Sequence, residues 1–197
     1  LVDDFEIRGG GIVREALGDT LSGVRDRVLL RNYKWEPSNI SFERRAERYR
    51  QRPTLLLMTG ERAQDRKSLA KDLEQRLFEI GNVVYFLGMG NVLYGVDADI
   101  ERGVGNRQEH LRRMAEVANL MLDAGVILIV TAGELTQADV ELIKATVQPD
   151  RIEVVWVGET VTTDVGHDLL VPDPDADDAV DLVKQLLQEK GIIFRPW

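Results

Sequence analysis

The segment 59–70 contains residue types that bind phosphate groups in proteins. It follows an apolar stretch directly and holds Gly60, Arg66 and the pair Lys67-Ser68. A glycine-rich loop after a strand, ending in lysine and serine, binds nucleotides because its backbone N–H groups, ammonium group and hydroxyl converge on phosphate and magnesium. The chemistry that this segment indicates is therefore the binding or transfer of a phosphoryl group.

Most of the residues that such a loop needs are nevertheless missing. Arg66 stands before Lys67 where the motif requires glycine, and Glu61 and Asp65 bring negative charge towards any polyphosphate. In the alternative interpretation this is a plain loop whose Asp65 caps the next helix and interacts with its dipole. The sequence predicts a degenerate phosphate loop, and its candidate nucleotide-binding residues are Gly60, Arg66, Lys67 and Ser68.

Short apolar strands alternate with amphipathic helices in the larger part of the chain. The predicted strands are 55–59, 83–87, 126–131, 152–157 and 169–171. The predicted helices are 67–80, 107–124, 137–147, capped by Thr136, and 176–190. This alternation predicts an α/β fold with a parallel sheet between two helical layers.

The first fifty residues have a different pattern. Residues 1–8 alternate like a strand, and a short apolar pair, Ile12-Val13, follows three glycines. A helix is predicted over 22–32, and a second helix over 42–51 with Ser38 or Ser41 as its cap. The expected division is a strand fragment of a preceding domain (1–14), a linker with short helices (15–52) and the main domain (53–197).

Composition limits the classes of function. The chain of 197 residues is 44% hydrophobic and 30% charged, has no cysteine and has two histidines, so thiolate and histidine-rich metal sites are excluded. The net charge of -9 argues against a nucleic-acid partner. Because neither a membrane-length apolar run nor a signal peptide is visible, we expect a cytoplasmic protein without a membrane partner.

Several segments together resemble one family. They are Thr59-Gly60 with Leu69-Ala70, the stretches 74–81 and 90–95, and above all 107–118 with its continuation to Gly125. On these residues the chain, from about Asn32 to its end, resembles the adenylylsulfate kinase family. These are P-loop enzymes with a three-layer sandwich fold that phosphorylate the 3′-hydroxyl of adenylylsulfate (APS). The resemblance implies that fold for this chain.

The family's phosphate loop and acid motif are largely replaced here. Aligned without a gap, the loop glycines fall on Ala63 and Asp65, the phosphate lysine on Arg66 and the magnesium serine on Lys67, beside Ser68. The Asp-Gly-Asp-Asn motif of the family falls on 88–91. Its second aspartate, the family's presumed base or magnesium partner, becomes Gly90, which cannot accept a proton.

The substrate side is also altered. An arginine that holds the phosphosulfate in the family is Leu93 here, the Phe-Ile-Ser-Pro segment falls on 133–136, and the basic lid is replaced by a short loop after 158. Three residues match family substrate residues, namely Asn91, Arg107 and Arg112, and His110 stands where the family has asparagine. In the alternative interpretation the arginines pair with nearby acids such as Glu109 or Glu116, and His110 is a surface residue.

The leading hypothesis is therefore a degenerate, non-catalytic member of the family, without catalytic or metal-binding residues, that acts in binding, regulation or assembly. The alternative is an active kinase that uses Mg-ATP. It would need Arg66 or Lys67 in place of the loop lysine, and Glu134 or Asp97 as the acid.

Residues 1–13 resemble the closing strands of the last β-barrel in translation-factor-like GTPases, including the GTPase subunit of sulfate adenylyltransferase. That resemblance makes components of sulfate adenylyltransferase the expected partners, and an inert scaffold that docks such a partner is a third hypothesis. Because active kinases of the family form dimers, the resemblance also implies a homodimer.

Overall fold

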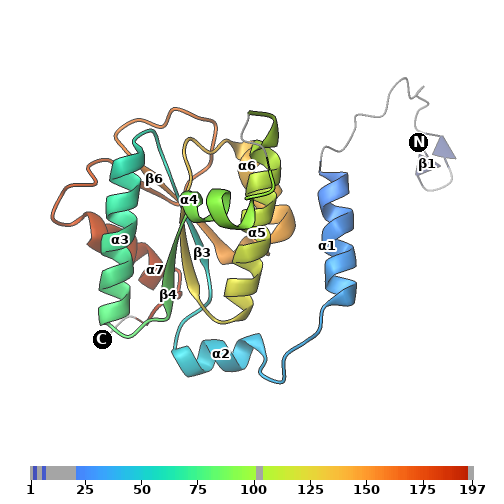
Figure 1. The fold of residues 1–197 in the computed structure, drawn as a ribbon, viewed down its shortest axis with the longest axis horizontal. Coiled ribbons are helices and arrows are strands. Elements are labelled where there is room, and N and C mark those ends of the chain that lie inside the picture. Colours follow the sequence, from blue (N-terminus) through green and yellow to red (C-terminus); the bar gives the residue numbers. More distant parts are fainter. Residues whose placement is uncertain (1, 4–5, 8–20, 101–103, 195–197) are drawn as a thin grey trace.

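A five-stranded parallel sheet forms the centre of the molecule (Figure 1). The computed structural model describes residues 2–3, 6–7, 21–100 and 104–194. The strands are β3 (Leu55–Thr59), β4 (Val84–Gly88), β5 (Ile127–Thr131), β6 (Ile152–Val157) and β7 (Leu169–Val171). Their order is β4-β5-β3-β6-β7, and every neighbouring pair is parallel.

Helices cover both faces of this sheet, which confirms the predicted three-layer α/β fold. Helices α3 (Ala63–Glu79) and α7 (Ala179–Glu189) pack on one face, and α5 (Arg107–Asp123) and α6 (Gln137–Thr146) on the other (Figure 1). Successive residues of β3 alternate between these two cores: Leu55 and Leu57 face α5 and α6, whereas Leu56 and Met58 face α3 and α7. Burial on both faces explains the continuous apolar runs of the strands.

Two helices precede the sheet. Helix α1 (Ser22–Lys34) lies outside the α5–α6 layer, where Arg31 binds Glu116 at 2.7 Å and the Thr146 carbonyl at 3.2 Å (Figure 1). Helix α2 (Phe42–Tyr49) begins at the predicted residue, because the Ser41 hydroxyl accepts a hydrogen bond from the backbone N–H of Arg44.

The structure corrects several predicted boundaries. Helix α3 begins at Ala63 instead of Lys67, and α7 begins at Ala179 instead of 176. Asp65 therefore lies within the first turn of α3, and the prediction that it caps this helix is wrong. Four short elements were not predicted: α4 (Met89–Asn91), the π-helical segment η1 (Val92–Val96), η2 (Val104–Asn106) and η3 (Pro149–Arg151).

Residues 2–3 and 6–7 form two short paired strands instead of the single predicted strand. Strands β1 (Val2–Asp3) and β2 (Glu6–Ile7) pair antiparallel, because a strand needs a hydrogen-bonded neighbour and this segment supplies its own. The predicted apolar pair Ile12-Val13 lies outside the described residues. None of the described helices combines the length and the apolar character that crossing a membrane requires.

Candidate functional site

The connection between β3 and α3 has only three residues, Gly60 to Arg62. Gly60 adopts φ 139°, and a Cβ at this position would lie 2.1 Å from the backbone carbonyl oxygen of Val157. The loop therefore packs directly on β6. Residues 63–66, which the family resemblance assigns to the phosphate loop, form the first turn of α3.

Arg66 is buried between two loops. Its Nη1 donates a hydrogen bond to the Gly60 carbonyl, which also accepts from the backbone N–H of Glu134 at 3.3 Å. Its Nη2 would be 3.3 Å from a Cβ placed on Gly133. Burial lowers the pKa of the guanidinium, and the negative charges of Glu134 and Asp65 oppose that shift. The Gly60 carbonyl thus joins the loop after β3 to the loop after β5, and Arg66 binds the same carbonyl.

The other predicted phosphate-binding residues lie elsewhere. Helix α3 buries Arg66, Leu69 and Ala70 against the sheet, so Lys67 and Ser68 are exposed on its outer side. Neither the Lys67 nor the Ser68 side chain has a hydrogen bond or ion pair to another described residue. The structure consequently does not bring the four candidate nucleotide-binding residues together.

A pocket of about 400 Å³, here called the acidic pocket, lies beside this loop at the C-terminal ends of β3, β6 and β7. Its lining residues are Glu61, Arg62, Asp65, Val157, Gly158, Glu159, Thr160, Pro172, Asp173, Pro174 and Asp175. Five of them are acidic and one is basic, so the pocket presents a negative potential. Within the described part of the chain, no group of three or more metal-ligating side chains could hold a metal ion.

A second pocket of about 420 Å³, here called the His110 pocket, lies between α4–η1, α5 and the loop after β5. It is lined by Met89, Leu93, Arg107, His110, Leu111, Ala132 and Gly133. Leu93 supplies an apolar wall where the resemblance places an arginine. Of the three predicted substrate-binding residues, only Arg107 lines this pocket.

Arg107 is held in place by the loop after β5 and by α6. Its Nε and Nη2 donate to Asp139 Oδ2 at 3.3 and 2.9 Å, and Nη2 also donates to the carbonyls of Gly133 and Glu134. Burial alone would raise the pKa of Asp139, but hydrogen bonds from Arg107 and Thr136 lower it overall. The expected pairing with an acid on its own helix is therefore wrong for Arg107, whose partner lies on α6.

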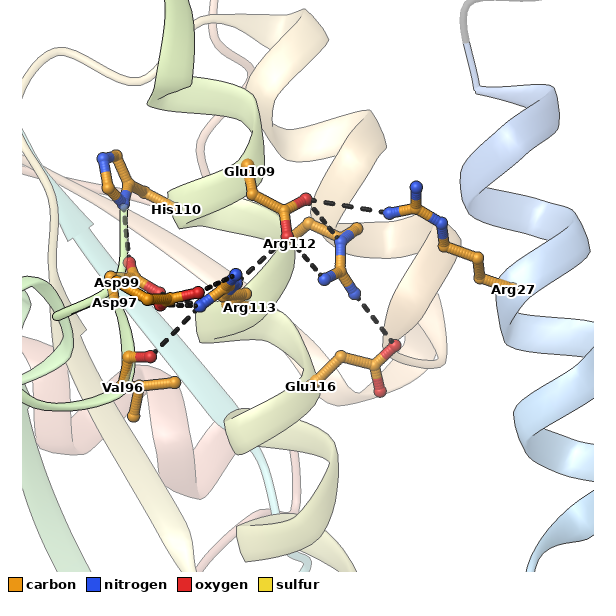
Figure 2. Close-up of polar contacts among 9 residues, drawn as sticks. All are labelled: Arg27, Val96, Asp97, Asp99, Glu109, His110, Arg112, Arg113 and Glu116. Atoms are coloured by element: carbon orange, nitrogen blue, oxygen red, sulfur yellow. Dashed lines mark hydrogen bonds and ion pairs between the residues drawn. The ribbon is translucent and has the colours of Figure 1, made fainter. Parts of the chain in front are cut away.

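His110 is buried, so its interpretation as a surface residue is also wrong. Its Nδ1 lies 2.6 Å from Oδ2 of Asp97, whose side chain is 0% exposed (Figure 2). The sequence analysis missed this pair. The sequence does carry a signal that Arg107 and His110 line one pocket, because they are three residues apart on a helix and therefore share a face.

Arg112 points away from the pocket into an ion-pair network, as the pairing interpretation predicted. It forms two hydrogen bonds of 2.7 Å with Glu109 and lies 3.9 Å from Glu116, and Arg27 of α1 approaches Glu109 at 3.8 Å (Figure 2). Arg113 also binds Glu109, at 3.0 Å. Arg112 therefore holds Glu109 and Glu116, the two acids that also pair with Arg27 and Arg31 of α1.

The other residues predicted to take part in substrate binding or catalysis do not line the His110 pocket. Asn91 is exposed at the end of α4, and Glu134 is exposed with a left-handed φ of 40°. The loop of eleven residues between β6 and β7 takes the place of the family's lid. It is fastened to the domain, because Trp156 Nε1 donates to the Thr160 carbonyl at 2.9 Å and the Thr163 hydroxyl donates to the Leu135 carbonyl at 2.6 Å.

The ion-pair network makes stability depend on pH. Hydrogen bonds from Arg112, followed by burial that opposes them and a bond from Arg113, lower the pKa of Glu109 from 4.5 to about 2. A lowered folded-state pKa stabilises the protein above pH 4.5, and this contribution is lost as the pH falls towards 2. Since a third of the side chain is exposed, we expect Glu109→Gln to cost about 1 kcal/mol at pH 7.

Urea unfolding at pH 7, 4, 3 and 2.5 measures this contribution. The difference between the wild type and Glu109→Gln should shrink steadily below pH 4.5. The control is Glu61→Gln, because the exposed Glu61 has no hydrogen bond or ion pair in the described structure. A difference that stays constant down to pH 2.5 would contradict the role of the arginines.

The parallel sheet and its two helical layers define a P-loop-kinase-like α/β sandwich, and the sequence comparisons identify its family. The sequence profile of adenylylsulphate kinase matches residues 52–168, which is more than half of the chain. The chain belongs to the adenylylsulphate kinase family. The adenylyl-sulfate kinase of Shewanella halifaxensis is 36% identical over 111 residues, which are 56% of this chain and 54% of that protein. The chain thus spans about half the length of the curated relatives that it matches.

Solved structures agree with this assignment. A point mutant of the Mycobacterium tuberculosis APS kinase is 25% identical with a TM-score of 0.62, and the match covers 70% of this chain and 99% of that one. A hexameric APS kinase from Thiobacillus denitrificans shares the fold with a TM-score of 0.58 at 17% identity, over 75% of this chain and 32% of that one.

Proposed function

We propose that this chain is a non-catalytic member of the adenylylsulphate kinase family that acts as a binding, regulatory or assembly module. The observation that carries the proposal is the backbone of residues 63–66, which form a helical turn. A phosphate loop works by turning several backbone N–H groups towards one anion. In this chain the N–H of Arg66 already donates to the Arg62 carbonyl, at 3.3 Å.

The side chains around this loop do not fit a magnesium–triphosphate group. Lys67 and Ser68 are exposed on the outer side of α3, whereas the Arg66 guanidinium is directed back to the Gly60 carbonyl. Five carboxylates line the acidic pocket beside the loop and would repel a polyphosphate.

The alternative, an active adenylylsulfate kinase, needs an acid near the substrate hydroxyl. Asp97 is fully buried and binds His110, and Glu134 is exposed at the end of the loop after β5. Gly90, at the position of the family's acid, has no side chain to accept a proton. These placements favour the non-catalytic function over the alternative.

A turnover assay tests the proposal. The chain is incubated with ATP, APS and magnesium, and phosphoadenylylsulfate formation is compared with that of the Shewanella halifaxensis relative under the same conditions. We expect a rate at least roughly a thousandfold below that of the relative, because losing one electrostatic group alone costs about a hundredfold or more. A substantial rate that is abolished by Arg66→Ala or Lys67→Ala, in variants with unchanged circular dichroism, would establish the active-kinase alternative.

The division into a barrel fragment (1–14), a linker (15–52) and the kinase-like domain (53–197) belongs to the same proposal, with sulfate adenylyltransferase components as partners. Co-purification with those components measures the assembly role. The packing of α1 on α6 supports a linker that is partly attached to the domain. The hexamer of the Thiobacillus denitrificans relative favours self-association, which light scattering measures.

A further inference from the structure

The His110 pocket has mostly apolar walls and two polar groups that face the same space. Met89, Leu93, Leu111 and Ala132 supply the walls, and the pocket volume is about 420 Å³. Ligand pockets in proteins commonly combine an apolar lining of this size with a few convergent polar groups. The two polar side chains, Arg107 and His110, are therefore the groups that would orient a ligand.

One nitrogen of the Arg107 guanidinium, Nη1, is available to bind a ligand. Its Nε and Nη2 make four hydrogen bonds to described residues, namely to Asp139 and to two backbone carbonyls, and 48% of its side chain is exposed. Nη1 bonds to none of the described residues. The other bonds fix the plane of the group and Arg107 lines the pocket, so Nη1 is the guanidinium nitrogen that can still donate to an anion there.

His110 is positioned by Asp97 in a similar way. The Asp97 carboxylate accepts a hydrogen bond from Nδ1 at 2.6 Å, and the second ring nitrogen lies on the far side of the ring (Figure 2). Nε2 has no hydrogen bond to any residue that the structure describes. A hydroxyl group suits Nε2 whether the ring is neutral or protonated, because a hydroxyl both donates and accepts.

We propose that the His110 pocket binds a small hydroxyl-bearing organic acid with an apolar ring, its carboxylate on Arg107 and its hydroxyl on His110. The two orienting residues are three apart on α5, which places their Cβ atoms about 5–6 Å from each other. A hydroxylated aromatic acid carries its carboxylate and its hydroxyl on one apolar ring, so it can engage two such neighbouring side chains at once. A ligand with many hydrogen-bonding groups fits less well, because the apolar side chains that line the rest of the pocket would leave those groups without hydrogen-bond partners.

The proposal deepens the proposed function, on which it rests, by naming the ligand class of the pocket. The two tests are independent, because one measures phosphoryl transfer and the other measures binding in the absence of ATP. Turnover of APS would refute the non-catalytic function. The titration would still show separately whether the His110 pocket binds the proposed ligand class.

The chain has two histidines, so imidazole NMR reports on the pocket with an internal control. The 2-, 3- and 4-hydroxybenzoates are titrated into the labelled full chain, together with benzoate, which lacks the hydroxyl, and phenol, which lacks the carboxylate. We expect one hydroxybenzoate to shift the His110 signals with saturation below about 1 mM, and both control compounds to bind at least tenfold more weakly. The signals of the exposed His167 should not move.

Arg107→Gln should weaken the best hydroxybenzoate by about tenfold or more, because it removes the charged donor. If this variant does not fold, the affinities of the wild type for hydroxybenzoate, benzoate and phenol still test whether both the carboxylate and the hydroxyl contribute to binding. The proposal is overturned if no hydroxybenzoate saturates at 10 mM, if benzoate binds equally well, or if His167 shifts in parallel with His110. Tighter binding of adenosine monophosphate than of every hydroxybenzoate would also overturn this ligand class.

Discussion

Gly60→Ala is expected to lower the free energy of unfolding by about 3 kcal/mol. The new Cβ would lie 2.1 Å from the Val157 carbonyl oxygen, which belongs to a central strand and cannot move without disturbing the sheet. The φ of 139° is also a conformation that residues with a side chain rarely adopt. Chemical denaturation monitored by the fluorescence of the buried Trp156 measures the loss.

Gly90→Ala is the matched control. Gly90 lies in α4, where nothing is within 4 Å of a new Cβ. A glycine replaced under these conditions stabilises a protein by up to about 1 kcal/mol, through the entropy of the unfolded chain. Equal stabilities of the two variants would mean that the loop after β3 does not pack on β6 as described.

His110→Ala has the second large expected effect, a loss of about 3 kcal/mol. Removing the imidazole leaves the Asp97 carboxylate buried, with Arg113 Nη1 at 3.8 Å from its other oxygen. Oδ1 of Asp97 has no hydrogen-bond partner among the described residues, so the contact with His110 is the main compensation for burying this charge.

A double-mutant cycle isolates this interaction. The variant Asp97→Ala/His110→Ala should be at least about 1 kcal/mol more stable than the sum of the two single losses predicts, because neither partner is left alone. His167→Ala, at an exposed position, should change stability by less than about 0.5 kcal/mol. A loss for His110→Ala no larger than that of His167→Ala would refute the buried pair.

The sequence predicted the sheet well because strands buried on both faces are short continuous apolar runs. The bounds of β3, β6 and β7 agree with the predicted ranges 55–59, 152–157 and 169–171. The short helix α4 and the π-helical η1 were missed because the stretch 88–97 contains three glycines and lacks a periodic apolar pattern.

The candidate site was predicted less completely. Residue types alone predicted that phosphate-binding groups are missing, which stays a prediction, and the start of α3 was placed four residues too late. Ala63, Gln64 and Arg66 favour helix, and this local signal was outweighed by the expectation of a loop at this place in the family. His110 was misjudged because its buried partner Asp97 lies thirteen residues away, directly after η1.

The helical turn at residues 63–66 also limits how this segment could be converted into a phosphate loop. Such a conversion would need glycine at 63 and 65, and each glycine introduced into a helix costs up to about 1 kcal/mol. The Arg66 N–H would also have to leave its bond to the Arg62 carbonyl before it could turn towards an anion. Each single substitution towards a phosphate loop therefore costs stability before it could contribute to phosphate binding, so a designed phosphate loop would need all the changes together.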